Sequence, residues 1–195
     1  MSNFRYPDKP TLSTLDAISH LSEQDYIGQC KYDGWRLQMI YDDKWHIFTR
    51  TGKDIKDVPN IKMPQQLLED INCLSVPKGS SLDAEFVGPR GHLPPSVYIF
   101  DCLRWDGSWL SRCAFEDRWK RCLSLVEQGI ILGGDKEIQL AYTFEQDFLT
   151  EFNKMRDEWP DISEGIVLKR RKGMLALSRK SSVTSKDQFK CKFRN

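Results

Sequence analysis

The order of apolar and polar residues predicts several short strands in the first half of the chain. Residues 37–41 and 45–49 are rich in aromatic, aliphatic and β-branched side chains, and the polar residues 42–44 between them supply a turn. This pattern predicts a β-hairpin. Residues 82–87 and 97–102 also have strand character, and the prolines and glycines between them indicate a loop.

Apolar residues recur at spacings of three and four in two longer segments, which predicts helices over residues 114–128 and 145–159. Gly129 and Pro160 would end them, and a shorter helix is expected over residues 64–71. We interpret both apolar stripes as core. The first stripe contains Phe115, Trp119, Cys122, Leu123 and Val126, and the second contains Phe148, Leu149, Phe152, Met155 and Trp159.

The order of these elements favours one α+β domain over residues 1–195, with largely antiparallel sheets flanked by helices. Further strands are expected at 165–169 and 189–193, and residues 1–13, which carry two prolines, are interpreted as an N-terminal arm. Neither a Gly-x-Gly-x-x-Gly motif nor a P-loop motif occurs, so the usual Rossmann and P-loop nucleotide sites are excluded.

The composition is that of a folded globular protein, with 39% apolar and 11% aromatic residues among 195. We find no apolar run of membrane-spanning length and no signal-peptide pattern in residues 1–20. The six cysteines form no Cys-x-x-Cys pair, which argues against a zinc site or a disulfide scaffold. We therefore expect a reducing compartment, either cytoplasm or nucleus, and a virus-encoded protein would also fit.

The formal net charge of +1 conceals an uneven distribution. Residues 164–195 hold ten Lys or Arg and two acidic residues, whereas the other 163 residues hold nineteen basic and twenty-six acidic residues. A basic end of this kind is either a solvated tail or a surface for phosphates, and charge alone leaves both readings open.

The segment 31–36, Lys-Tyr-Asp-Gly-Trp-Arg, is the sharpest local feature. Gly34 permits a tight turn that would present Lys31 and Arg36 toward one cavity. A lysine in such a place can act as a covalent nucleophile when its amine is free. Taken alone, the segment favours the other interpretation, which is an ordinary β-turn with a solvated lysine.

Lys190 and Lys192 would share one face of the last strand, because side chains alternate along a strand. Phe189, Cys191 and Phe193 would share the other face and pack into a core. The two lysines could guard an edge strand against aggregation. They could also hold a phosphate between them, which would relieve their mutual repulsion.

Two carboxylates, Glu85 and Glu164, lie beside apolar strand residues. Burying a carboxylate is costly unless it is paired or bound to a metal ion, so each is a candidate site residue. Exposure at a strand end is the alternative for both. Arg50 follows the predicted hairpin, where an arginine is usually a surface charge.

The order of the motifs is more specific than any one of them. It resembles that of the covalent nucleotidyltransferase superfamily of polynucleotide ligases and RNA capping enzymes, and most closely the adenylation domain of ATP-dependent DNA ligases. The matching segments cover nearly the whole chain. They lie at residues 31–36, 49–52, 83–87, 98–101, 164–169 and 190–192.

The resemblance implies a role for each matched residue. In that family the first-motif lysine attacks the α-phosphorus of ATP and becomes lysyl-AMP, and Lys31 takes that position. Gln29 and Cys30, directly before it, are expected in the nucleotide pocket, and Gln29 departs from the glutamate frequent there. By resemblance, Asp33 and Arg36 shape the site, and Arg50 contacts the nucleotide or a 5′-phosphate. Glu85 is expected to contact ribose or a metal ion, Phe100 to stack on adenine, and Glu164 to be linked to the metal ion. The residues expected to contact the α-phosphate are Lys169, Lys190 and Lys192.

The resemblance also implies substrates and partners. The family passes AMP to a 5′-phosphate and seals nicks in duplex DNA with ATP and Mg²⁺, in DNA repair, replication and recombination. We expect a monomer without membrane contact and, since an OB-fold domain would begin just after Lys192, no OB-fold in this chain. The residues expected to contact nucleic acid are Arg50, Arg170, Arg171, Lys172, Arg179, Lys180 and Lys186.

Two other functions remain open at this point. An RNA ligase would use the same chemistry, and a degenerate nucleic-acid-binding module would keep the fold without the reaction. A capping guanylyltransferase fits residues 49–52 and 100–107 less well. The presence of Lys31 and Glu164 argues against the binding module, because binding alone needs no nucleophile.

Overall fold

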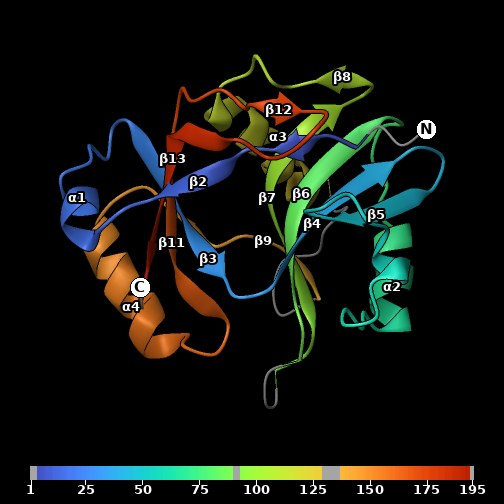
Figure 1. Ribbon diagram of the computed structural model, residues 1–195, viewed down its shortest axis with the longest axis horizontal. Coiled ribbons are helices and arrows are strands. Elements are labelled where there is room, and N and C mark those ends of the chain that lie inside the picture. The colour runs from blue at the N-terminus through green and yellow to red at the C-terminus, as the bar shows by residue number, and fades with distance from the viewer. Residues whose placement is uncertain (1–3, 90–92, 129–136, 194–195) are drawn as a thin grey trace.

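The computed structural model describes residues 4–89, 93–128 and 137–193. Expectations that concern residues 1–3, Gly91, Gly129 and residues 194–195 lie outside this part of the chain. The described residues form two main β-sheets, a short two-stranded ribbon and flanking helices, as Figure 1 shows.

The first sheet has five strands in the order β10-β3-β11-β13-β2. All its pairs are antiparallel except β13 with β2. Since β11 and β13 follow β3 by more than a hundred residues, the central pairings of this sheet are long-range. The strands are β10 (Thr143–Phe144), β3 (Tyr26–Tyr32), β11 (Ser163–Arg170), β13 (Thr184–Lys192) and β2 (Lys9–Leu12).

The second sheet has the order β5-β4-β6-β7-β8, and β9 (Ile138–Leu140) adds to β7 in parallel. A two-stranded ribbon pairs β1 (Tyr6–Pro7) with β12 (Leu177–Ser178). The strands of the second sheet are β5 (Trp45–Thr49), β4 (Trp35–Tyr41), β6 (Ser80–Val87), β7 (Ser96–Trp105) and β8 (Ser108–Trp109).

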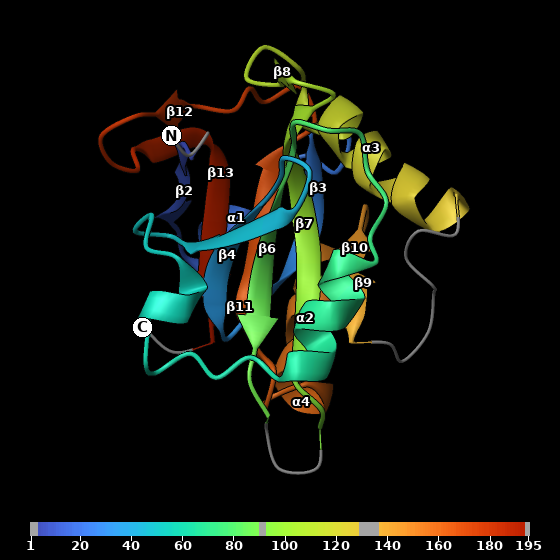
Figure 2. The same ribbon diagram turned by 90° about the vertical axis from the view of Figure 1, so that its right-hand side faces the viewer.

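Helices cover the outer sides of both sheets. Figure 1 shows α1 and α4 beside the first sheet, and Figure 2 shows α2 in front of the second sheet and α3 to the right of it. None of the helices in the described part of the chain is long and apolar enough to cross a membrane. The helices are α1 (Leu15–Ser19), α2 (Gln65–Asn72), α3 (Phe115–Glu127) and α4 (Phe148–Glu158), with one 3-10 turn, η1 (Ile55–Asp57).

Each sheet packs its own apolar core against its helices. The first core joins the second sheet to α2 and α3, and the second core joins the first sheet to α1 and α4. Tyr32 of β3 stacks on Tyr98 of β7 with 3.7 Å between ring centres, which links the two sheets. Because the apolar side chains pack largely toward the helices, polar side chains are left between the sheets.

The predicted α+β class with largely antiparallel sheets is confirmed, as are the hairpin and the three predicted helices. The apolar stripes were only partly right. Leu123, Val126 and Leu149 are 40%, 39% and 45% exposed, whereas Arg118 and Leu125 are buried in α3. An ion pair with a buried carboxylate allows an arginine to occupy the core-facing side of this helix.

The described residues of the expected N-terminal arm include two short strands that pair with later strands. Tyr6–Pro7 pairs with β12, and Lys9–Leu12 pairs with β13. Asp8 between them is buried, and its carboxylate accepts a hydrogen bond of 3.0 Å from Gln188. Proline is compatible with edge strands, so the prolines of this segment do not prevent it from joining the sheets.

Candidate active site

Three neighbouring strands bring the predicted nucleophile and the last lysine together. In the register of β3, β11 and β13, Lys31 lies opposite Gly165, and Gly165 lies opposite Lys192. Gly165 carries no side chain, so both lysines can lean over it toward the same point. The side chains expected to share a face of the last strand do so, and β13 is internal, which removes the edge-strand alternative for Lys190 and Lys192.

Glu164 is the carboxylate on which the two lysines meet. It lies at an irregularity of β11, between Ser163 and Gly165. The Lys31 ammonium donates to one oxygen of Glu164, and Lys192 Nζ donates to the other at 2.5 Å. Burial alone would raise the pKa of Glu164, but the hydrogen bonds from Lys192 and Lys31 outweigh it and lower the pKa. The carboxylate is therefore held ionised between two cations.

The backbone at Gly165 accepts no other residue without rearrangement. Its φ is +145°, and a Cβ at this position would lie 1.9 Å from the carbonyl oxygen of Cys191. Strand β13 therefore lies directly against the bare backbone of Gly165. This close approach places Lys192 near Glu164.

Lys190 adds a third cation to the same face. It pairs in register with Val167, which in turn pairs with Gln29. Burial, Lys31 and Lys192 all lower the pKa of Lys190. The face thus carries three ammonium groups and one carboxylate, which is a favourable arrangement for a phosphate group.

Gln29 presents a buried acceptor that has no donor among the described residues. Its side chain is 1% exposed, and its Nε2 donates to the Thr143 hydroxyl at 3.4 Å. That hydroxyl donates its own proton to the carbonyl of Ala141 at 2.9 Å, so it can only accept from Gln29. The amide orientation is thereby fixed, and Gln29 Oε1 is left unpaired.

The second sheet contributes Arg36 and Glu85, which are cross-strand partners on β4 and β6. Arg36 makes a two-point ion pair with Asp83, with distances of 3.0 and 2.5 Å, and donates to the carbonyl of Asp8 at 2.9 Å. Burial raises the pKa of Glu85 to about 8, although Lys31 and Arg36 oppose the rise. A Cβ added to Gly34 would lie 3.1 Å from Glu85 Cγ, so Glu85 lies beside the turn that follows Lys31.

The buried Lys169 and the partly buried Phe100 form a separate group. Lys169 Nζ donates to the Phe100 carbonyl at 3.0 Å, and it lies 4.8 Å from the centre of the Phe100 ring. Asp101 lies 3.7 Å from the same ammonium. Arg36 lies 5.5 Å from the Phe100 ring, so two cations already contact the side chain that we expected to stack on adenine.

The structure does not bring Lys169 into the cluster around Glu164. Lys169 is 4% exposed and pairs in register with Gln188, four residues along β11 from Gly165. Burial lowers the pKa of Lys169, whereas the nearby Asp101 opposes the change. The expected contact of Lys169 with an α-phosphate finds no support in this placement.

Three other predicted residues lie on or directly after strands of the two sheets. Asp33 is exposed directly after β3, and its backbone N–H donates to the Ile162 carbonyl at 2.9 Å. Cys30 is buried on the opposite face of β3, where burial raises the pKa of its thiol to about 12. Arg50 is exposed, and its backbone N–H donates to the Arg36 carbonyl at 3.1 Å.

The basic residues expected to meet nucleic acid divide into two groups. Arg170 pairs with Asp187 at 3.5 Å, and Arg171 pairs with Glu145 at 2.7 Å, so both have intramolecular partners. The other five are exposed, and none has a carboxylate partner within 4 Å among the described residues. These are Arg50, Lys172, Arg179, Lys180 and Lys186.

Sequence reasoning missed the buried acids that hold the site's cations. Asp83 and Asp101 are 1% and 2% exposed, and they pair with Arg36 and Arg118. A signal was available, because each aspartate has apolar neighbours in its strand, where burial requires a cationic partner. The identity of that partner depends on tertiary structure.

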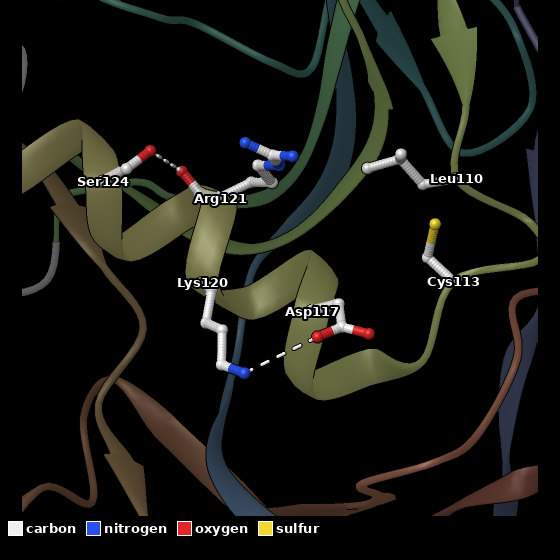
Figure 3. A pocket seen from close by; sticks show the side chains of 6 residues that line it. All are labelled: Leu110, Cys113, Asp117, Lys120, Arg121 and Ser124. Atoms are coloured by element: carbon white, nitrogen blue, oxygen red, sulfur yellow. Dashed lines mark hydrogen bonds and ion pairs between the residues drawn. The ribbon is translucent and has the colours of Figure 1, made fainter.

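A hollow of about 350 Å³ lies on the outer side of α3, as Figure 3 shows. Leu110 and Cys113 line one side of it, and Arg121 and Ser124 of α3 line the other. Lys120 and Asp117 pair with each other at its edge, 3.6 Å apart. The hollow contains no residue of the Lys31 cluster.

The carboxylates of the site suit a divalent cation that is bound by protein carboxylates together with substrate phosphates. No group of three or more His, Cys, Asp or Glu residues that could hold a metal ion occurs in the described parts of the chain. The charge of Glu164 acts on Glu85, so the site offers two carboxylates. Mg²⁺ is commonly bound through one or two carboxylates and substrate phosphates, so these residues fit it.

The described chain has the fold of ligase-type nucleotidyltransferase domains, which confirms the expected fold. Mycobacterial DNA ligase D complexed with ATP and MES is 20% identical, over 98% of this chain and 61% of that one, with a TM-score of 0.69. The ligase domain of M. tuberculosis LigD is 20% identical, over 96% and 60%, with a TM-score of 0.68. Chlorella virus DNA ligase-adenylate is 18% identical, over 96% and 68%, with a TM-score of 0.59.

The chain spans about 60% of the length of the two mycobacterial ligase structures. No protein-family model matches the chain, and no curated protein matches it. At these identities the likeness concerns the fold, and the chemistry has to be argued from the side chains.

Proposed function

We propose that residues 1–195 form the adenylation domain and catalytic core of an ATP-dependent polynucleotide ligase that seals nicks in duplex DNA. The meeting of Lys31 and Lys192 on Glu164, with Lys190 beside them, is the observation that carries this proposal. It combines a lysine nucleophile with the cations that a transferring phosphoryl group requires.

The first step forms a bond between Lys31 Nζ and the α-phosphorus of ATP. The bond from that phosphorus to the bridging oxygen breaks, and pyrophosphate leaves. The Lys31 side chain is 20% exposed, so its ammonium can leave Glu164 and release a proton to water. Lys190 and Lys192 stabilise the charge that develops on the phosphoryl oxygens.

Two further transfers complete the proposed reaction. A 5′-phosphate oxygen at the nick attacks the phosphorus of lysyl-AMP and displaces Lys31. The neighbouring 3′-hydroxyl then attacks the activated 5′-phosphate, which forms the phosphodiester bond and releases AMP. Each transfer breaks one bond to phosphorus as another forms, so one cationic site serves all three.

Gln29 supports adenine as the base. Its buried Oε1 needs a donor, and the exocyclic amino group of adenine is one, whereas guanine has a carbonyl at the same ring position. Two structural neighbours point the same way, since one is complexed with ATP and another is a ligase-adenylate. We therefore propose ATP as the nucleotide.

A divalent cation, proposed as Mg²⁺, would be held by Glu85 and Glu164 together with substrate phosphates. Its chemical contribution would be to neutralise charge on those phosphates. Because burial raises the pKa of the Glu85 carboxyl to about 8, Glu85 would release its proton as the cation binds, since a nearby cation favours the ionised form.

The polymer is proposed as nicked duplex DNA, because the similar solved structures are DNA ligases. Lys172, Arg179, Lys180 and Lys186 are available for phosphates. The cellular roles proposed for such an enzyme are DNA repair, replication and recombination, with the chain acting as a monomer.

Labelled nucleotide tests the proposal. The chain is incubated with α-labelled ATP, GTP or NAD and Mg²⁺, and then chased with a DNA nick or an RNA-containing nick. We expect an acid-labile label from ATP on the protein that moves to DNA. Lys31→Arg is the matched control, since it keeps the charge opposite Glu164 but removes the amine, and it should take up no label.

Other outcomes would replace the proposal. Transfer of label only to RNA-containing nicks would make the chain an RNA ligase. A failure to label the wild-type chain under any condition would leave a nucleic-acid-binding module. Labelling of Lys31→Arg at the wild-type level would show that Lys31 is not the nucleophile.

A further inference from the structure

A cluster of arginines surrounds one tryptophan near the β8 end of the second sheet. The guanidinium carbons of Arg5 and Arg104 lie 5.5 and 5.4 Å from the centre of the Trp109 ring. Arg104 and Trp109 are partners in register on β7 and β8. Figures 1 and 2 both show β8 and β12 at the same end of the molecule.

The ribbon of β1 and β12 adds a third arginine. Tyr6 pairs with Ser178 in antiparallel register, so the next residues outward, Arg5 and Arg179, lie opposite each other. Burial and the charges of Arg179 and Arg104 lower the pKa of Arg5. Like charges in opposing positions destabilise a β-ribbon, so the fold tolerates a repulsive arrangement here.

These three arginines lack the partners that other arginines of the chain have. No carboxylate lies within 4 Å of Arg5, Arg104 or Arg179 among the described residues, and one terminal nitrogen of Arg104 is buried without a hydrogen-bond partner. Five other arginines pair with carboxylates, whereas Arg50, Arg112 and Arg121 also have no carboxylate within 4 Å among the described residues. The paired arginines are Arg36, Arg118, Arg156, Arg170 and Arg171.

The cluster is held by ordered backbone. The turn between β7 and β8 contains Asp106 and Gly107 with φ of +46° and +76°, as a tight hairpin requires. Arg104 Nε donates to the Gly107 carbonyl at 2.9 Å, which fixes the guanidinium beside the indole. The three charges are thus presented by β7 and by the residues directly beside β1 and β12.

We infer that Arg5, Arg104 and Arg179 form a binding surface for the sugar–phosphate backbone of duplex nucleic acid. Guanidinium groups bind phosphates through paired donors, and an anion between them would relieve their repulsion. Arg104 lies four residues beyond Phe100 on β7, about 13 Å along the strand. The surface is therefore separate from the nucleotide site, and its assignment to a nucleic acid rests on the proposed function.

Salt-dependent binding of the full chain to a nicked duplex tests this surface. The duplex carries a 5′-hydroxyl at the nick and a fluorescein label, and ATP is left out so that only binding is measured. We compare Arg179→Gln and the triple variant Arg5→Gln/Arg104→Gln/Arg179→Gln with the wild type. The matched control is Arg156→Gln, which removes one exposed positive charge from α4.

We expect the slope of log K against log salt to fall by about 1 for Arg179→Gln and by about 2 to 3 for the triple variant. Arg156→Gln should keep the wild-type slope. Because Arg179 is exposed, we expect Arg179→Gln to fold, so its binding can be measured even if the triple variant does not fold.

The inference fails if Arg179→Gln, or a folded triple variant, binds the duplex with the wild-type constant and slope. It also fails if Arg156→Gln weakens binding as much as Arg179→Gln. Transfer of AMP to Lys31 without DNA should be unchanged in all three variants. The two proposals can also be separated. If the wild-type chain takes up no AMP, but the arginine variants lose duplex binding, the proposed function is contradicted and the binding surface is supported.

Discussion

Arg118 and Asp101 form a two-point ion pair that ties helix α3 to strand β7. The guanidinium donates to the two carboxylate oxygens at 2.9 and 3.1 Å, and both side chains are almost completely buried. Asp101 also lies 3.7 Å from Lys169, which donates to the Phe100 carbonyl. One buried carboxylate therefore connects α3 with Lys169 and with the backbone of Phe100.

We predict that Arg118→Ala destabilises the chain by about 3–5 kcal/mol, because it leaves Asp101 with a single buried cationic partner. Chemical unfolding in urea measures the change. Arg156→Ala, which removes an exposed arginine paired with Asp157, should change stability by less than about 1 kcal/mol. Equal losses for the two variants would mean that the Arg118–Asp101 pair does not stabilise the fold.

The sequence predicts those parts of the fold that depend on local pattern. The hairpin of β4 and β5 follows from two β-rich runs and a polar turn, and α4 follows from apolar spacing and the proline after it. Strand β3 was missed, because its pairing with β11 joins residues more than 130 positions apart. Local pattern carries no information about such a partner.

In the candidate site, too, some features follow from the sequence and others depend on tertiary structure. Lys31 and Glu164 could be singled out from motif order, and the structure brings them together. Lys169 belongs to a matching motif, yet its ammonium is held by Asp101 and the Phe100 carbonyl. A motif gives the residue type, whereas the surrounding charges decide where the side chain lies.

Glu85 should make stability depend on pH. Because burial raises the pKa of its carboxyl to about 8, the folded chain holds a proton that the unfolded chain loses above its ordinary pKa of 4.5. The contribution of Glu85 to stability therefore falls as pH rises from about 4.5 to about 8, by at most about 1.4 kcal/mol per pH unit.

Glu85→Gln removes this titration. Urea unfolding at pH 5.5 and pH 8 should show a smaller loss of stability in the variant than in the wild type. Glu145→Gln, which replaces an exposed carboxylate, should retain the wild-type pH dependence. A wild-type slope in Glu85→Gln would mean that Glu85 is already ionised at pH 5.5 in the folded chain.

Gln29 should determine the choice between ATP and GTP. Replacement by alanine removes the buried acceptor, and we expect selectivity for ATP over GTP to fall by roughly 5- to 100-fold, equivalent to about 1–3 kcal/mol. The measurement is the rate of label uptake at Lys31 from each nucleotide. Gln139→Ala is a comparison on another strand, and it should leave the ratio unchanged. Unchanged selectivity in Gln29→Ala would remove Gln29 from base recognition.

Gly165 should tolerate no side chain. A Cβ there would lie 1.9 Å from the Cys191 carbonyl oxygen, at a φ of +145°, so we expect Gly165→Ala to cost more than about 2 kcal/mol. Gly88→Ala is the matched control, because its added Cβ would lie 3.5 Å from Trp35, an ordinary contact. Thermal unfolding compares the two, and equal melting temperatures would contradict the close approach of β13 to Gly165.

Glu164 should compete with phosphate for the lysines of the site. Its carboxylate pairs with Lys31 and Lys192 and lies near Lys190, so Glu164→Gln leaves three ammonium groups without their anion. We expect pyrophosphate to bind this variant about tenfold more tightly, a change of about 1.4 kcal/mol, because one nearby negative charge is lost. Calorimetric titration without divalent cations measures the affinity, and Glu145→Gln, which lies outside the site, should match the wild type. Weaker pyrophosphate binding in Glu164→Gln would show that the carboxylate holds the lysines in their binding positions and does not compete for them.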